Sequence, residues 1–284
     1  GTIQIANFLI QRIKENGGVV LNNKEVSRFV VDDSKNKVIA VETKNGERYE
    51  AKFFISNIHP SLTLDLLDKT RSIKKAYISR IKSRANTFGI FTTYLTLKKN
   101  KVKYRNRNFY IHGTDDVWYN AKNGRNGVNY TLICYQHNKG SLYSDVVMLL
   151  TPMCMNRLRE WENTEVGRRG KSYLTFKEEY AARMINFVRD RGFDFTDDID
   201  HIYTTTPLSY RDYLGSIDGS AYGIIKDFKC PELSFVLPRT KLENLFFTGQ
   251  NLNIHGALGV TLTSTLTCAE FVGHEYLAKK IGAI

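Results

Sequence analysis

Apolar residues recur every three or four positions in two stretches of the chain, residues 3–15 and 260–280. This spacing places apolar side chains on one face of a helix, so it predicts a helix over each stretch. Gly17 and Gly18 would end the first helix. The apolar stripes are formed by Ile5, Leu9 and Ile13 in the first stretch and by Leu262, Leu266, Ala269, Val272 and Tyr276 in the second.

Short runs rich in β-branched and aromatic residues predict strands between these two helices. The predicted strands are 19–21, 26–31, 38–43, 49–56, 88–97, 128–135, 146–150, 199–206 and 245–248. Asn45–Gly46 is typical of a hairpin turn. Helical spacing returns over 60–82 and again after Thr175, where Thr175–Glu178 matches a capping box. This mixture predicts an α/β chain of the α+β kind.

The composition allows a large folded core. The chain has 284 residues, of which 42% are hydrophobic, enough for one large domain or two smaller ones. No apolar run is long enough to span a bilayer, and the opening segment lacks the features of a signal peptide. The cysteines are far apart, which predicts neither a disulfide framework nor a metal site, but free thiols in a reducing, cytoplasmic compartment. They are Cys134, Cys154, Cys230 and Cys268.

The net charge of +12 comes largely from two basic stretches, residues 69–84 and 98–107. These stretches form either solvated faces of the fold or a surface that contacts anionic lipid at the membrane periphery. Nucleic acid is a third possible partner, but the chain lacks the spacing of any nucleic-acid-binding module, so we expect none. The first two interpretations stay open.

The segment near the carboxyl end has a pattern that could serve ligand binding. An apolar run over 245–248 leads into Gly249, then into the Gly-containing stretch His255–Val260, and then into a helix. Glycines allow a backbone to approach a flat ligand, and a helix amino end presents free N–H groups and a positive dipole end. Such an end could stabilise negative charge on a phosphate or a reduced flavin. A loop whose glycines serve only turn geometry would have the same sequence.

Four blocks of the sequence resemble, in order, the phytoene desaturase, carotenoid isomerase and retinol saturase family. They are EVSRFVVDD from Glu25, FFISNIHPSLTLDLL from Phe53, TTTPLSYRDYLGSIDGSAYGI from Thr204, and ENLFFTGQNLNIHGALGVTLTSTLTCAEFVG from Glu243. We refer to the third block, residues 204–224, as the Thr-Pro block. The resemblance covers the two ends of the chain well and the middle poorly.

The resemblance implies a glutathione-reductase-like FAD fold whose cofactor domain is discontinuous. Residues 1–58 and 206–284 would form part of the FAD domain, and 59–205 an inserted substrate domain of a sheet with helices. The family grips the FAD pyrophosphate with G-x-G-x-x-G, and this sequence has no such motif. We therefore expect a C-terminal fragment that, alone, binds FAD weakly or not at all.

The resemblance also implies roles for individual residues. Backbone pairing of Val26 with adenine is expected, with Ser56 and Asn57 near the pyrophosphate. The remaining cofactor contacts would be Gly249 and Gln250 at the ribityl and phosphate portion, and Leu258, Gly259, Val260 and Thr261 at the isoalloxazine edge. His255 would be the catalytic proton or hydrogen-bond donor, and Tyr210 and Tyr222 would line the substrate tunnel. A core position for Val26, turn geometry for the glycines and a structural role for His255 are the alternatives.

Two functions follow from these expectations. The first is part of an FAD-dependent oxidoreductase that reduces, desaturates or isomerises C=C bonds of an apolar polyene or isoprenoid, with retinol saturase-like reduction preferred. The second is a non-catalytic lipid- or membrane-surface-binding module that has kept the fold and lost the cofactor.

Overall fold

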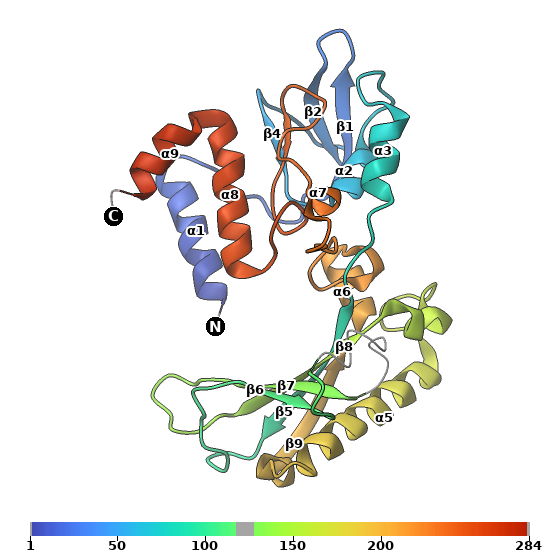
Figure 1. The fold of residues 1–284 in the computed structure, drawn as a ribbon, viewed down its shortest axis with the longest axis vertical. Helices are drawn as coiled ribbons and strands as arrows, with labels where there is room; N and C mark the ends of the chain where they lie inside the picture. The colour runs from blue at the N-terminus through green and yellow to red at the C-terminus, as the bar shows by residue number, and fades with distance from the viewer. Residues whose placement is uncertain (1, 118–127, 283–284) are drawn as a thin grey trace. The chain divides into compact units, whose positions relative to one another are not determined.

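The computed structural model describes residues 2–117 and 128–282, and the chain clusters into two compact units (Figure 1). The first unit contains residues 1–82, 237–248 and 265–284, and the second contains 83–236 and 249–264. The chain thus returns to the first unit after completing most of the second. The predicted division into an FAD part and a substrate part concerns ligand binding and stays a prediction.

The first unit contains a three-stranded antiparallel sheet in the order β1-β2-β3. Its strands are β1 (Val26–Asp32), β2 (Lys37–Thr43) and β3 (Arg48–Glu50). The predicted hairpin between β2 and β3 is confirmed: Gly46 has a φ of +80°, and its N–H donates to Thr43 O at 2.9 Å. Glycine adopts this left-handed backbone without steric cost, which is why the Asn-Gly pair predicts the turn.

A second, two-stranded parallel sheet joins segments that are far apart in the sequence. Strand β4 (Phe54–Ser56) pairs with β10 (Leu245–Phe247), with Phe54 opposite Leu245. The buried Asn244 fixes this junction. Its Nδ2 donates to Val38 O at 2.8 Å and to Lys52 O at 3.0 Å, and its Oδ1 accepts from Val38 N at 2.9 Å.

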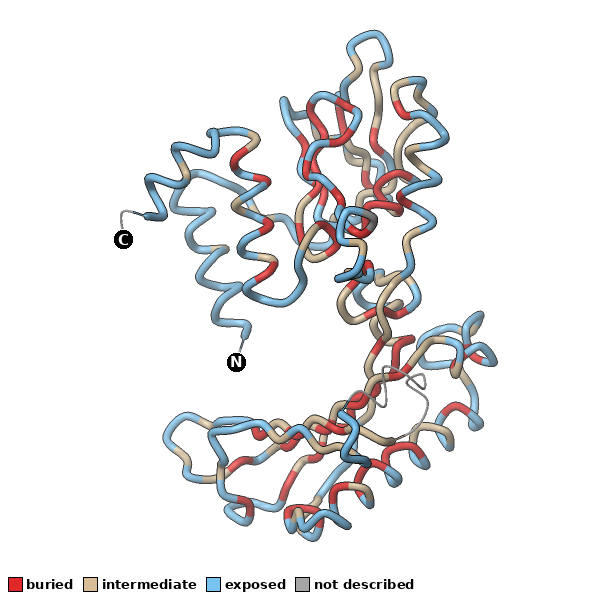
Figure 2. Tube along the Cα trace, in the orientation of Figure 1, coloured by how far each residue is buried: buried red, intermediate tan, exposed pale blue. Residues whose placement is uncertain are grey.

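Helices α1 (Ile3–Glu15), α2 (Pro60–Leu66), α3 (Lys75–Lys82) and α9 (His274–Ile281) belong to the first unit, and α8 (Gly256–Val272) begins in the second unit and ends in the first. No residue of α1 or of α9 is buried, as their pale colour in Figure 2 shows. The amphipathic pattern that predicted α1 is present, but its apolar face is exposed. That face carries Ile3, Ile5, Phe8, Leu9 and Ile13.

The second unit is built on a five-stranded antiparallel sheet in the order β6-β7-β8-β5-β9. The strands are β5 (Gly89–Leu97), β6 (Phe109–His112), β7 (Tyr130–Tyr135), β8 (Val146–Met153) and β9 (Ile199–Thr205). The long helix α5 (Gly170–Arg189) lies along one face of this sheet (Figure 1).

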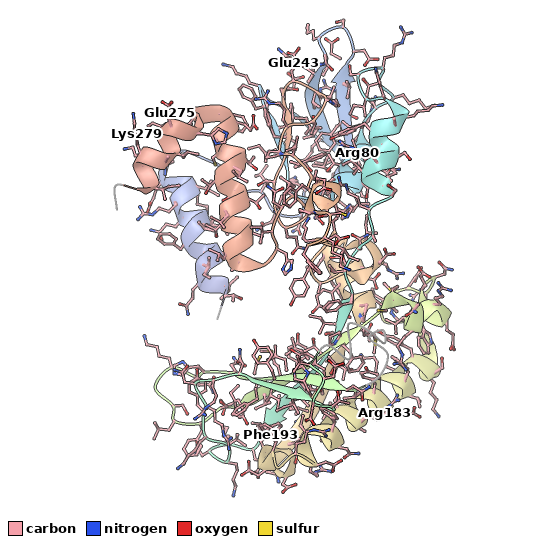
Figure 3. All side chains as sticks on the ribbon, in the orientation of Figure 1. Arg80, Arg183, Phe193, Glu243, Glu275 and Lys279 are labelled. Atoms are coloured by element: carbon pink, nitrogen blue, oxygen red, sulfur yellow. The ribbon has the colours of Figure 1, made fainter. Side chains whose placement is uncertain are left out.

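Alternate strand residues pack against α5 and form the main core. Phe91 of β5 contacts Tyr180 of α5 with ring centroids 4.6 Å apart, and both side chains are fully buried. Beyond the end of α5, Phe193 packs on Phe109 at 5.2 Å (Figure 3). Shorter helices complete the unit: η1 (Met155–Trp161), η2 (Asp194–Asp198), α6 (Pro207–Leu214), η3 (Ile217–Gly219) and α7 (Pro231–Ser234).

The predicted α+β class is confirmed, and the errors lie mainly at element boundaries. Val19–Leu21 forms no strand, because Val19 and Leu21 are exposed and the segment pairs with no strand in the part of the chain that the structure describes. The predicted strand 49–56 is two strands, since the chain leaves β3 to pair with β10. The predicted helix 60–82 is likewise two helices, α2 and α3.

The capping-box prediction at Thr175 is wrong. Helix α5 begins at Gly170, and Thr175 lies within its second turn. The long helix over 260–280 is also wrong in outline, because it starts four residues earlier and breaks at Gly273. Gly273 has a φ of +85°, which lies outside the helical region. Strand β6 and helix α6 were not predicted.

Within the described ranges 2–117 and 128–282, every helix is too short or too polar to cross a bilayer. The same residues contain no group of three or more His, Cys, Asp and Glu side chains that could hold a metal ion. All four cysteines are free thiols, and burial raises the pKa of Cys134.

Candidate functional site

The second unit brings together two segments that the sequence analysis singled out. The loop 249–255 lies against the end of the Thr-Pro block, where Asn251 Oδ1 accepts from Ile224 N at 3.2 Å. Lys226 Nζ donates to both Asn251 O and Leu252 O at 2.9 Å. Asn251 is buried, so these hydrogen bonds attach the interior-facing part of the loop to residues 224 and 226.

The rings of Tyr222 and His255 lie in contact, with centroids 4.6 Å apart and planes at 35°. The Tyr222 ring also packs edge-on with Phe88, with centroids 6.0 Å apart, and its backbone N–H donates to Thr87 Oγ1 at 3.1 Å. His255 is exposed. The structure thus pairs the residue predicted to be catalytic with a residue predicted to contact substrate. Both roles stay predictions.

Tyr210, on α6, belongs to the same neighbourhood. Burial raises the pKa of Tyr210. A hydrogen bond with Thr92 opposes this rise, and the nearby Tyr94 and Tyr222 phenols add to it. The Tyr210 phenol thus lies near the phenols of Tyr94 and Tyr222, and the substrate-lining roles of Tyr210 and Tyr222 stay predictions. Thr92 and Tyr94 come from β5 and were not singled out from the sequence.

The face of the sheet opposite α5 carries a set of tyrosine and apolar side chains. Strand alternation places Phe91 and Leu95 toward α5, so Thr92 and Tyr94 point to the other face. The neighbouring strands add half-buried residues to this face, which we call the tyrosine face: Tyr130, Leu132 and Cys134 of β7, and Met148 and Leu150 of β8, with Tyr110 and Tyr203 more exposed. The signal for it was apolar residues at successive positions in β7 and β8, which indicates strands apolar on both faces.

The remaining predicted cofactor residues of the second unit surround the start of α8. Gly249 has a φ of +93°, a conformation that favours glycine. A Cβ on Gly259 would lie 2.5 Å from Ile254 Cγ2 and 2.7 Å from Ile254 C, so the loop packs directly on the helix backbone. Leu258 is 75% exposed, and Thr261 is also exposed. Gln250 and Val260 are half-buried.

The other predicted cofactor residues lie in the first unit. Val26 is half-buried and pairs with Thr43 at the start of β1. Ser56 is buried, and its hydroxyl is 2.7 Å from Thr63 Oγ1, while Asn57 is exposed just after β4. No observation tests whether these residues contact a cofactor. Their proposed roles stay predictions.

The second basic stretch is partly balanced by acidic side chains. A cavity of about 420 Å³ is lined by Lys101, Lys103 and Arg105 together with Asp194, Asp197 and Asp198. Lys98 also lies 3.9 Å from Asp198. Because the acidic side chains partly neutralise the basic ones, this cavity favours the interpretation as a solvated face over the interpretation as a contact surface for anionic lipid.

Lys226 leads to a prediction about pH. Burial and then the nearby Arg84 charge lower its pKa from 10.5 to about 8. Between those values the unfolded chain holds a proton that the folded chain has lost, so the free energy of unfolding should rise with pH from about 8 to 10.5. Lys226→Met should remove this rise. Urea denaturation at a series of pH values measures it.

The exposed Lys229 provides the matched control. Lys229→Met should keep the pH dependence of the unmodified protein. If the stability difference between the protein and Lys226→Met is constant from about pH 7 to 10, the assignment of the lowered pKa to Lys226 is wrong.

The sequence was compared with known proteins. No family model matches it. It is 23% identical to all-trans-retinol 13,14-reductase of Danio rerio, in an alignment that covers 96% of this chain and 48% of that protein. The Rattus norvegicus protein of the same name is 21% identical, with 100% of this chain and 50% of that protein covered. The predicted resemblance to the retinol saturase family is confirmed. The chain spans about half the length of these retinol saturases.

Solved structures agree on the fold. An oxidoreductase from Methanosarcina mazei superposes with a TM-score of 0.54 at 12% identity, covering 90% of this chain and 51% of that one. A putrescine oxidase redesigned in its cofactor binding gives 0.51 at 12% identity, covering 96% and 52%. At this identity the likeness concerns the fold alone. Each of the two solved structures shares that fold with the present chain over about half of its own length.

Proposed function

We propose that this chain forms the flavin-edge and substrate-contacting part of an FAD-dependent oxidoreductase that acts on C=C bonds of an apolar polyene or isoprenoid. Reduction of the kind named for the retinol saturases is the preferred reaction. The observation that carries the proposal is the fixed contact between the loop 249–255 and the Thr-Pro block. It stabilises the start of α8 beside Tyr222 and His255.

The start of α8 fits the edge of a flavin. FAD, when bound, would supply the hydride chemistry. The first turn of α8 presents backbone N–H groups and the positive end of the helix dipole, which stabilise negative charge on a reduced ring. Gly259 lets this turn pack on the loop, and the exposed Leu258, with Val260 and Thr261, would contact the ring edge. Gly249 and Gln250 would lie along the ribityl and phosphate portion.

Side chains near this loop suit an apolar substrate. The tyrosine face offers apolar area with few charges, since Leu132, Met148 and Leu150 lie between its tyrosines. Tyr210 and Tyr222 would orient the polyene, and His255, held against Tyr222, would donate a proton or a hydrogen bond. A substrate without charge fits a surface whose polar groups are mainly phenols and hydroxyls.

The first unit supports the proposal that residues outside this sequence complete the cofactor domain. Parallel strands are usually covered on both faces, yet Phe53, just before β4, and Ile55, within β4, are 56% and 55% exposed. The apolar face of α1 is exposed as well. Exposed apolar surface of this extent marks a site of further packing. The half-length alignment with the retinol saturases agrees with this proposal.

A titration with FAD tests the proposal. The complete gene product should bind FAD and purify yellow, whereas the chain of residues 1–284 should bind it weakly, because G-x-G-x-x-G is missing. Binding is measured by quenching of FAD fluorescence. A complete gene product free of flavin after purification, and unable to bind added FAD, would overturn the proposal.

The alternative, a lipid-surface-binding module without cofactor, rests on the first basic stretch and the exposed apolar face of α1. Flotation with vesicles of anionic lipid separates the two. Salt-sensitive binding by a flavin-free complete gene product would favour the module, while a flavin-containing protein that does not float would favour the enzyme.

A further inference from the structure

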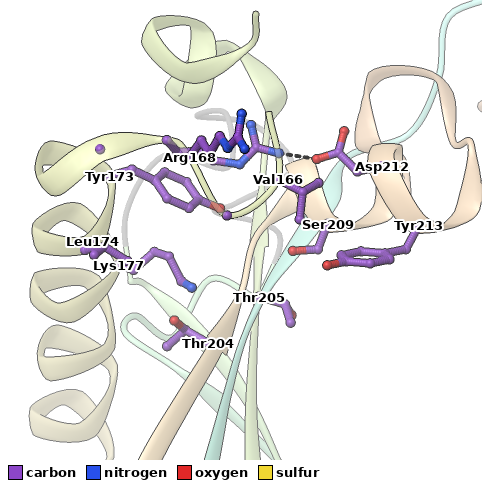
Figure 4. Close-up of a pocket in the computed structure, with 13 residues that line it drawn as sticks. Val166, Arg168, Tyr173, Leu174, Lys177, Thr204, Thr205, Ser209, Asp212 and Tyr213 are labelled. Atoms are coloured by element: carbon purple, nitrogen blue, oxygen red, sulfur yellow. Dashed lines mark hydrogen bonds and ion pairs between the residues drawn. The ribbon is translucent and has the colours of Figure 1, made fainter. Parts of the chain in front are cut away.

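A separate cavity of about 590 Å³ lies in the second unit, where the start of α5, the end of β9 and helix α6 meet (Figure 4). None of the residues assigned above to flavin or polyene lines it. The lining residues are Val166, Gly167, Arg168, Arg169, Gly170, Tyr173, Leu174, Lys177, Thr204, Thr205, Ser209, Asp212 and Tyr213. Its volume is within the usual range for sites that bind a small molecule.

Positive charge exceeds negative charge in this lining. Asp212 is the single carboxylate among the lining residues, and it is already held by Arg169 and, at 2.9 Å, by Arg211. Arg169 also donates to the carbonyls of Thr164 and Trp161, so its hydrogen-bonding capacity serves the fold. Arg168 pairs with Glu165 at 3.5 Å near the surface. Among the lining residues that the structure describes, Lys177 is the cation left for a ligand.

Lys177 projects from α5 into the cavity toward Thr204 (Figure 4). It is half-buried, and among the residues that the structure describes no carboxylate lies within ion-pair distance of it. Its charge lies 5.5 Å from the Tyr173 ring centroid. Burial and then the charge of Arg169 lower the pKa of Lys177, as expected for a cation that lacks a compensating anion.

The amino end of α5 also favours an anion in this cavity. This helix has 20 residues, no side chain caps its first N–H groups, and its first turn contains no acidic residue. Gly167 and Gly170, both with positive φ, bring this backbone to the cavity wall. Uncapped N–H groups and the dipole favour an anion there, in addition to the Lys177 charge.

The rest of the lining combines apolar side chains with the hydroxyls of Thr204, Thr205 and Ser209. Val166, Leu174 and Tyr213 are each at least 49% exposed and line the cavity. A lining of this kind suits a hydrocarbon group next to the charged head. We infer that this cavity binds an amphiphilic anion, a molecule with a phosphate or carboxylate head that pairs with Lys177 and an apolar body that contacts Val166, Leu174 and Tyr213. The inference does not depend on the flavin chemistry.

Calorimetric titration of the chain with octyl phosphate, octanoate, octanol and inorganic phosphate tests this inference. Octyl phosphate or octanoate should bind, and the stronger of the two identifies the head group. Octanol lacks the charge and inorganic phosphate lacks the apolar body, so both should bind at least about tenfold more weakly. Equal affinity for octanol, for inorganic phosphate and for the amphiphiles would overturn the inference.

Three variants locate the binding. Lys177→Met should raise the Kd about tenfold or more, because methionine cannot replace the charged hydrogen bond to the head group. Lys177→Arg, which keeps the charge, should retain measurable binding. Lys171→Met removes an exposed lysine from the same helix outside the cavity lining and should leave the Kd unchanged. An unchanged Kd in a folded Lys177→Met protein, judged by circular dichroism, would place the binding elsewhere and overturn the assignment.

Discussion

Replacing Asn244 by alanine should lower the free energy of unfolding by about 3 kcal/mol or more. The change removes three hydrogen bonds, to Val38 N, Val38 O and Lys52 O. Each buried group left without a partner costs about 1–3 kcal/mol. The loss should be largest in the first unit, because Asn244 connects β2 to the β4–β10 junction. Urea denaturation followed by circular dichroism measures it.

Asn244→Asp sharpens this test, since it keeps the size of the side chain. Its carboxylate could still accept from Val38 N, but it would face the carbonyls of Val38 and Lys52 without a proton to donate. We expect it to be at least as destabilising as alanine near neutral pH. A stability within about 0.5 kcal/mol of the unmodified protein for both variants would contradict the role given to Asn244.

Local signals in the sequence predicted the parts of the fold that neighbouring residues determine. Asn45–Gly46 specifies its hairpin because the turn needs only a left-handed glycine. The break between β3 and β4 was not predictable in this way. It arises because β4 pairs with β10, 191 residues later in the chain. Nothing within the aromatic run over 49–56 indicates that partner.

The start of α5 shows how packing overrides a local signal. Thr175–Glu178 has the residues of a capping box, yet the helix starts at Gly170 because Tyr173 is buried against Trp161 and bonds to Thr206 Oγ1 at 2.9 Å. Burying this aromatic ring outweighs the contribution of a cap, about 1 kcal/mol. Tertiary contacts thus extended the helix past its apparent start.

The candidate site was predicted in part. The sequence singled out the loop 249–255 and the Thr-Pro block but did not predict the contact that Ile224 and Asn251 make between them. The roles of Gly249, Gly259 and Tyr222 stay predictions. Lys226 was missed because a lysine in a polar stretch has no feature that distinguishes it from a surface lysine. Only the structure shows that it donates to two main-chain carbonyls of the loop. The tyrosine face was missed because it is assembled from strands β5, β6, β7, β8 and β9. The sequence does not reveal which of these strands are neighbours in the sheet.

The glycines of the Thr-Pro block lead to the second large prediction. Gly219→Ala should lower the free energy of unfolding by about 2–5 kcal/mol. Gly219 has a φ of +58°, which costs an L-residue about 1–2 kcal/mol, and its new Cβ would lie 2.2 Å from Pro207 O. Relieving an overlap with backbone costs about 1–3 kcal/mol more. The same segment also approaches β5 closely, because a Cβ built on Gly89 would lie only 2.5 Å from Gly219 O.

Gly215→Ala isolates the overlap, since Gly215 has a similar φ of +64° with no atom within 4 Å of its Cβ position. It should cost only the conformational part, about 1–2 kcal/mol. Because Gly219 is three residues before Tyr222, the first variant should also disturb the Tyr222–His255 contact, which histidine proton chemical shifts would report, whereas Gly215→Ala should leave those shifts in place. Equal destabilisation by the two substitutions would mean that backbone conformation alone, and not the close approach of Pro207, requires glycine at position 219 of the Thr-Pro block.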